Sequence, residues 1–148
     1  MVADSVSVKD AGPLVRSVVV LPGCSMARAM SAFTNAPLLA RWWGGGELST
    51  ELTVGGPYLV RFPALGRTMT GRVLGYEPDR QLEFSWSWDG QEETGRTVTV
   101  NVCGGQPVSL TIEHGSYGDT EADLTARAEH RAGWQYFLPQ LAATLTRG

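Results

Sequence analysis

The chain has 148 residues, and its 12 basic and 15 acidic side chains give a net charge of −3 at pH 7. A chain of this length can form one domain that buries about two-thirds of its unfolded surface. It has no Lys/Arg-rich run to follow a phosphate backbone, and no stretch with the apolar length of a signal peptide or a membrane span. These features predict a soluble, cytoplasmic protein with no nucleic-acid and no membrane partner.

The N-terminal segment, residues 1–13, is polar and ends in a Gly-Pro pair. This composition predicts a disordered leader that carries no chemistry. The β-branched run at residues 14–21 predicts a first strand, and the Pro-Gly pair that follows marks the end of this strand. We therefore expect one folded domain over residues 14–148.

Two short helices are expected after this strand. Ser25 can cap the first, over residues 26–33, and Pro37 suits the first turn of the second. The second helix ends in Trp42 and Trp43, followed by three glycines. Adjacent indoles on a helix point to different sides, so we expect one to pack inward and the other to face a pocket mouth or solvent.

The middle of the chain consists of short alternating runs separated by turn signals, a pattern typical of an antiparallel meander. For the strand over residues 67–76 the inner face stays open, because Met69, Gly71 and Val73 compete with Arg72, Leu74 and Tyr76. Alternation places Arg61 outward. The other expected inward faces are Leu48, Thr50, Leu52 and Val54; Tyr58, Val60 and Phe62; Leu82, Phe84, Trp86 and Trp88; Val98, Val100 and Val102; and Val108, Leu110, Ile112 and His114.

The polar residues give little support for a metal site or for a catalytic Ser-His-Asp triad. The two histidines of the chain, His114 and His130, form neither an HxxxH nor an HxH arrangement, so we expect no metal site and no cofactor. A G-x-S-x-G elbow is also missing. Cys24 and Cys103 are far apart and lack a CxxC partner, which favours two reduced thiols.

The C-terminal segment predicts a long amphipathic helix that Asp119 or Thr120 caps. Gly133 and Pro139 interrupt its regularity, which predicts a bend. Such a helix needs a cover, and the natural cover is a curved sheet made by the preceding strands. The apolar stripe consists of Trp134, Phe137, Leu138, Leu141 and Leu145.

Six local motifs follow one another in a distinctive order. They are Trp42-Trp43-Gly44, Gly55-Gly56-Pro57-Tyr58, Gly71-Arg72-Val73-Leu74, Leu82-Glu83-Phe84-Ser85-Trp86, Leu110-Thr111-Ile112-Glu113-His114 and His130-Arg131-Ala132-Gly133-Trp134. Together they resemble the START-like (SRPBCC) superfamily, and within it the branch named after the activator of Hsp90 ATPase (AHSA1-type). The resemblance implies an α+β helix-grip fold: a curved antiparallel sheet wrapped around a long C-terminal helix, with two short helices after the first strand.

The resemblance also implies a small apolar or aromatic molecule as partner, bound without catalysis in a cavity between sheet and helix. The inward aromatic faces give the expected lining as Trp43, Tyr58, Phe84, Trp86, Trp88, His114, Trp134 and Phe137. A first alternative is a polyketide cyclase or dehydratase-like enzyme, with His114 as acid/base and Tyr58 as hydroxyl donor. A second is a co-chaperone-like protein-interaction module, which predicts an exposed apolar patch. A homodimer is compatible with each hypothesis.

Overall fold

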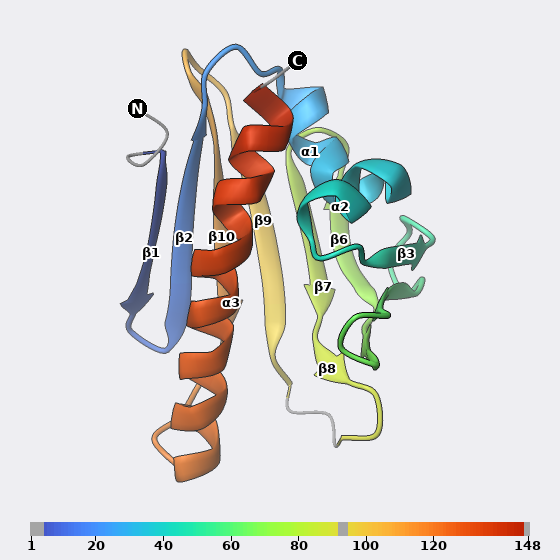
Figure 1. Ribbon diagram of the computed structural model, residues 1–148, viewed down its shortest axis with the longest axis vertical. Helices are drawn as coiled ribbons and strands as arrows, with labels where there is room; N and C mark the ends of the chain where they lie inside the picture. Colours follow the sequence, from blue (N-terminus) through green and yellow to red (C-terminus); the bar gives the residue numbers. More distant parts are fainter. Residues whose placement is uncertain (1–4, 92–94, 147–148) are drawn as a thin grey trace.

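The computed structural model describes residues 5–91 and 95–146. The long helix α3 (Glu121–Thr146) lies across a curved antiparallel sheet, and α1 (Met26–Thr34) and α2 (Ala36–Trp42) pack beside its C-terminal end (Figure 1). The predicted helix-grip arrangement is therefore confirmed.

In the described part of the chain, the larger sheet is antiparallel and has the order β1-β2-β10-β9-β7-β6. This order places β10 and β9 at its centre, below α3 (Figure 1). Its strands are β1 (Val6–Ala11), β2 (Leu14–Leu21), β6 (Val73–Glu77), β7 (Gln81–Ser85), β9 (Thr97–Cys103) and β10 (Val108–Gly115).

The smaller sheet has the order β3-β4-β5-β8, again among the described residues. It forms because two predicted strands are each divided, residues 67–76 into β5 and β6 and residues 81–88 into β7 and β8. Gly71 lies at the break, where an added Cβ would come 1.9 Å from the Ser85 carbonyl oxygen. Only glycine fits this close backbone approach. The bounds are β3 (Glu47–Thr50), β4 (Tyr58–Phe62), β5 (Arg67–Thr70) and β8 (Ser87–Trp88).

The structure shows which residues of the segment 67–76 face inward, a point that the sequence left undecided. Met69 and Val73 are fully buried, while Arg72 and Leu74 are exposed. Arg61 is exposed as expected. The predicted strand through Val54 is wrong at its C-terminal end, because backbone hydrogen bonds close a turn after β3 and leave Val54 exposed.

The disordered leader predicted over residues 1–13 is also wrong. Within it, Val6–Ala11 forms β1, which pairs antiparallel with β2. Residues 1–4 of that segment lie outside the described part. The leader prediction failed because an edge strand with polar alternate positions has little apolar signal, and its order comes from pairing with β2.

Both short helices have the predicted starts. The Ser25 hydroxyl accepts a hydrogen bond from the Arg28 N–H at 3.1 Å, and the Asn35 side chain accepts one from the Leu38 N–H at 3.0 Å. Trp42 packs inward and Trp43 lines the pocket described below, as expected, but the two rings do not point to different sides, since both are buried and stack with ring centroids 4.8 Å apart. Trp43 is the C-cap of α2, and its backbone is no longer helical. Its ring can therefore lie over that of Trp42.

Helix α3 begins after Thr120, whose hydroxyl accepts a hydrogen bond from the Asp123 N–H at 3.1 Å. It continues through Pro139 to Thr146. The predicted stripe faces the sheet, with Phe137 only partly buried and the remaining members buried. None of the described helices combines the length and the apolarity that crossing a bilayer requires.

Candidate functional site

A pocket of about 170 Å³ lies between the sheet and the middle of α3. Six residues predicted from the sequence line it: Trp43, Trp86, Trp88, His114, Trp134 and Phe137. The structure adds Phe62, Leu65, Glu129, His130 and Gly133. Most of these side chains are aromatic, and we call this space the aromatic pocket.

Four different elements bring these rings together. Trp86 sits at the break between β7 and β8, His114 near the end of β10, and Trp134 on α3. The Trp43 ring, just after α2, has its centroid 5.5 Å from that of Trp134 and 6.0 Å from that of Trp86. The indoles therefore form adjoining walls instead of one packed layer.

His114 is fully buried, and it presents a hydrogen-bond donor that has no partner. The Trp134 indole N–H donates to His114 Nδ1 at 3.1 Å, so neutral His114 carries its proton on Nε2. Among the described residues no acceptor reaches that nitrogen. Burial, followed by the nearby His130 and Arg96, holds the pKa of His114 well below its ordinary value. His114 is thus a neutral donor.

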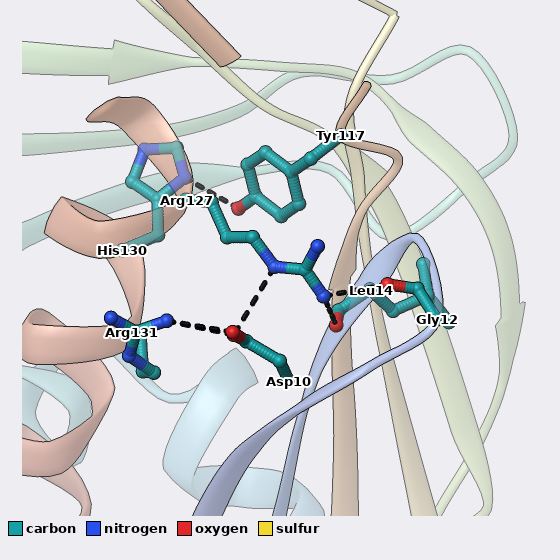
Figure 2. A network of polar contacts seen from close by, with 7 residues as sticks. All are labelled: Asp10, Gly12, Leu14, Tyr117, Arg127, His130 and Arg131. Atoms are coloured by element: carbon teal, nitrogen blue, oxygen red, sulfur yellow. Dashed lines mark hydrogen bonds and ion pairs between the residues drawn. The ribbon is translucent and has the colours of Figure 1, made fainter. Parts of the chain in front are cut away.

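His130 stacks on His114, with ring centroids 4.3 Å apart and planes 12° from parallel. Its Nδ1 lies 2.6 Å from the Tyr117 hydroxyl, a pair drawn in Figure 2. Burial first, then the positive charges of Arg96 and Arg67, lower the pKa of His130 to about 4. Both imidazoles are therefore uncharged at neutral pH.

Sequence reasoning missed His130 and Tyr117. His130 precedes Trp134 by four residues, so helical spacing places both on one face of α3, and this signal was available. Tyr117 lies in the loop between β10 and α3, where no periodicity exists to assign its direction.

A second, smaller pocket of about 70 Å³ adjoins the first. The two share Trp86, Trp88, Glu129 and His130 as lining residues. The second is completed by Arg67, Ser87, Gln91, Arg96 and Ala126. We call it the arginine pocket, because its own lining adds two guanidinium groups.

The two arginines are held differently. Arg96 is buried and forms an ion pair with Asp123. Its backbone carbonyl oxygen accepts a hydrogen bond from the backbone N–H of Trp86 at 2.9 Å. Arg67 is exposed, and its guanidinium carbon lies 4.0 Å from the centroid of the Trp88 ring. One positive charge is therefore fixed in the wall, and the other lies over an indole near the surface.

Tyr58 and Phe84 do not line the aromatic pocket, which corrects the predicted set. Both are fully buried and stack on each other with ring centroids 4.0 Å apart. The Tyr58 hydroxyl donates to the carbonyl oxygen of Phe33 at 2.6 Å, and burial raises the pKa of this phenol far above its ordinary value. Their faces point inward as predicted, but that part of the interior is packed against α1. Tyr58 therefore cannot act with His114 as hydroxyl donor.

A polar network fixes the N-terminal half of α3 to the turn between β1 and β2 (Figure 2). Asp10 forms ion pairs with Arg127 at 3.1 Å and with Arg131 at 2.9 Å. Arg127 also donates to the carbonyl oxygens of Gly12 at 2.6 Å and Leu14 at 2.8 Å. The helix therefore has an attachment to the sheet beside the pocket that needs no apolar packing in the pocket itself.

Other reactive groups lie elsewhere. Within residues 5–91 and 95–146, no three His, Cys, Asp or Glu side chains converge as ligands for a metal. Cys24 and Cys103 are free thiols, the first buried and the second exposed.

The family model described as "Activator of Hsp90 ATPase homolog 1-like protein" matches residues 24–146. No curated protein matches the chain. Among solved structures, DynU16, a protein of the dynemicin biosynthetic locus, is 28% identical with a TM-score of 0.76. That match covers 91% of this chain and 48% of DynU16, so this chain spans about half of that protein.

Two further structures share the fold at lower identity. Protein MLL2253 from Mesorhizobium loti is 20% identical with a TM-score of 0.74, over 89% of this chain and 97% of that one. The Aha1 dimer from Colwellia psychrerythraea is 18% identical with a TM-score of 0.74, over 90% and 96%.

Proposed function

The chain belongs to the activator of Hsp90 ATPase homolog 1-like family of the START-like superfamily, and from this we propose that it binds a small apolar or aromatic molecule in the aromatic pocket, without catalysis. The observation that carries this proposal is the ring-lined space with one buried, unpartnered donor, His114 Nε2. Apolar pockets with a few placed polar groups are the usual form of small-molecule sites.

The size of the pocket limits the ligand. An apolar cavity of about 150 Å³ holds one benzene ring, and the aromatic pocket has about 170 Å³. One ring or a short apolar group therefore fits inside, and a larger molecule would extend through the mouth. Ring-on-ring contacts with the indoles favour an aromatic guest, since each such pair contributes about 0.5–1.5 kcal/mol beyond area burial.

Binding explains the state of His114 better than acid/base chemistry does. Its Nδ1 accepts the Trp134 N–H, and its Nε2 already carries the proton. A ring in this state can donate a hydrogen bond to a ligand carbonyl or hydroxyl oxygen, but it has no free lone pair with which to remove a proton. DynU16 comes from a biosynthetic locus, which agrees with a small-molecule ligand.

Filling the pocket tests the proposal. Gly133 lines it, and an added Cβ there meets nothing within 4 Å, so Gly133→Leu should fill the space without a clash. We expect indole or naphthalene to quench the tryptophan fluorescence of the wild type, and Gly133→Leu to weaken that binding by about tenfold or more. The matched control is Ala132→Leu, on the exposed side of α3. Absence of binding to the wild type, or equal binding to Gly133→Leu, would refute the proposal.

Of the other two hypotheses, the enzyme has lost Tyr58 as its hydroxyl donor, and the protein-interaction module stays a prediction. The exposed large apolar side chains are scattered: Val54, Leu65 and Leu74 come from separate segments, and Leu124 and Tyr136 are twelve residues apart on α3. A homodimer has a precedent among proteins of this fold, since the Aha1 structure from Colwellia psychrerythraea is a dimer.

A further inference from the structure

The walls of the two pockets contain more hydrogen-bond donors than they use. His114 Nε2, Trp86 Nε1 and Arg96 Nε are buried and have no acceptor among the described residues. The three side chains are 0%, 7% and 8% exposed, respectively. Each of these nitrogen atoms carries a hydrogen and is a donor: His114 in the neutral tautomer derived above, and the Trp86 indole and the Arg96 guanidinium in their ordinary states. A buried polar group without a partner destabilises the protein, so an occupant whose acceptor atoms reach these donors would gain binding free energy from them.

The charges around the arginine pocket point the same way. Arg67 stacks on Trp88, and no ion pair to it is found within the described chain. Arg96 pairs with Asp123 through one terminal nitrogen and leaves its Nε unused. The positive field of both arginines reaches His130 and contributes to its low pKa. Glu129, exposed at the rim of both pockets, is the opposing charge.

The two pockets adjoin each other and differ in chemistry. Trp86, Trp88 and His130 stand between them and line both. A ring in the aromatic pocket therefore has the arginine pocket next to it, within reach of a short substituent. Carboxylates are the groups that arginine binds best, because two parallel N–H donors match two oxygens.

We propose that the ligand is an aryl or apolar carboxylate, with its ring in the aromatic pocket and its carboxylate in the arginine pocket, bound by Arg67, Arg96 Nε and Trp86 Nε1. This inference rests on the proposed function and specifies its ligand class. His114 Nε2 remains available to a second oxygen on the ring-bearing part of the molecule.

The test compares isosteric ligands that differ in charge. Isothermal titration of the wild type with phenylacetate, phenylacetamide and phenethylamine at pH 7.5 should give affinities in that order, with the carboxylate about tenfold tighter than the amide. Added salt should weaken phenylacetate binding and leave phenylacetamide binding unchanged.

Three variants locate the carboxylate. Arg67→Gln replaces an exposed side chain. It should weaken the binding of phenylacetate about five- to tenfold and leave the binding of phenylacetamide unchanged. Glu129→Gln removes the rim anion and should strengthen phenylacetate about twofold. Arg61→Gln is the matched control, since Arg61 is an exposed arginine on β4 that pairs with Glu47, and it should change neither affinity.

The outcomes separate this inference from the function beneath it. If the amide or the amine binds as tightly as the carboxylate, or Arg67→Gln acts no differently from Arg61→Gln, the carboxylate assignment is overturned while ligand binding stands. If phenylacetate and the neutral rings used above all fail to bind, both proposals fall together.

Discussion

The C-terminal half of α3 packs on the sheet through Leu138, Leu141 and Leu145, each at most 2% exposed, whereas the part that precedes these leucines holds His130 and Trp134 around a pocket. One half is a closed apolar seam. The other leaves donors unpaired and space unfilled. A single amphipathic helix thus stabilises the fold at one end and forms the wall of a binding site at the other.

The two halves also differ in what attaches them to the rest of the molecule. Beside the leucines, Arg28 of α1 donates to the carbonyl oxygens of Thr144 at 3.4 Å and Leu145 at 3.5 Å. At the pocket end, Arg127 and Arg131 bind Asp10 (Figure 2). Because charged contacts outside the pocket hold the helix there, the pocket can remain open without loss of the helix from the sheet.

Truncating one side chain of the leucine seam and one side chain that lines the pocket should expose this difference most strongly. Leu141→Ala removes a fully buried side chain and should lower the free energy of unfolding by about 4 kcal/mol. Phe137→Ala removes a partly buried ring at the pocket and should cost about 1 kcal/mol. Equilibrium unfolding in urea measures both. Equal losses would show that the pocket end is packed like the seam.

Acid should weaken the pocket end before it affects the seam. The pKa of His130 falls from an ordinary 6.5 to about 4 on folding, so the unfolded state binds the proton more readily between these values. Stability is then full above pH 6.5 and is lost as pH falls toward 4, by up to about 3 kcal/mol. The charged or titratable groups around His130 are His114, Tyr117, Arg67, Arg96 and Glu129.

Unfolding free energies at pH 7 and pH 5 measure this loss. The chain has two histidines, and burial lowers the pKa of His114 in the same direction, so His130→Gln should reduce the slope and the double variant with His114→Gln should abolish it above pH 5.5. A slope in the double variant equal to that of the wild type would contradict the assignment.

The ion pairs of Asp10 should have the smallest effect. Arg131 and Arg127 hold the pKa of the Asp10 carboxyl below its ordinary 3.8. Its contribution to stability is therefore complete above about pH 4 and is lost as pH falls through the lowered value. Asp10→Asn should be slightly less stable than the wild type at pH 7 and show a weaker decline below pH 4. The matched control is Asp79→Asn in the turn before β7, which should leave the acid limb unchanged.

Much of the fold could be predicted because its signals are local. The Ser25 cap placed α1 and Pro37 placed α2 correctly, alternation gave the inward faces of β4, β9 and β10, and the stripe of α3 faces the sheet. The errors came where tertiary contacts decide. Edge strand β1 has only Val6 and Val8 as an apolar alternation, and the close approach of Gly71 to Ser85 divides two strands between sheets.

The site was predicted in part for the same reason. Six of the eight expected residues line the aromatic pocket, since an inward aromatic face can be recognised from the sequence. Tyr58 and Phe84 share that pattern but lie in packed core. Alternation tells which way a side chain points, and it carries no information on whether another layer fills the space in front of it.

The sequence by itself determined most of the inward faces and the apolar stripe of α3, because periodicity and turn chemistry act within a few residues, and its six motifs implied the helix-grip class through their resemblance to a known family. Only the tertiary structure decided which inward rings surround a void, that His130 stacks on His114, and that Arg67 and Arg96 line one pocket with Trp86. These residues come from β5, β10 and α3, from the segment between β7 and β8, and from the position just before β9. Their distances depend on how the sheet curves under the helix, which no local pattern specifies.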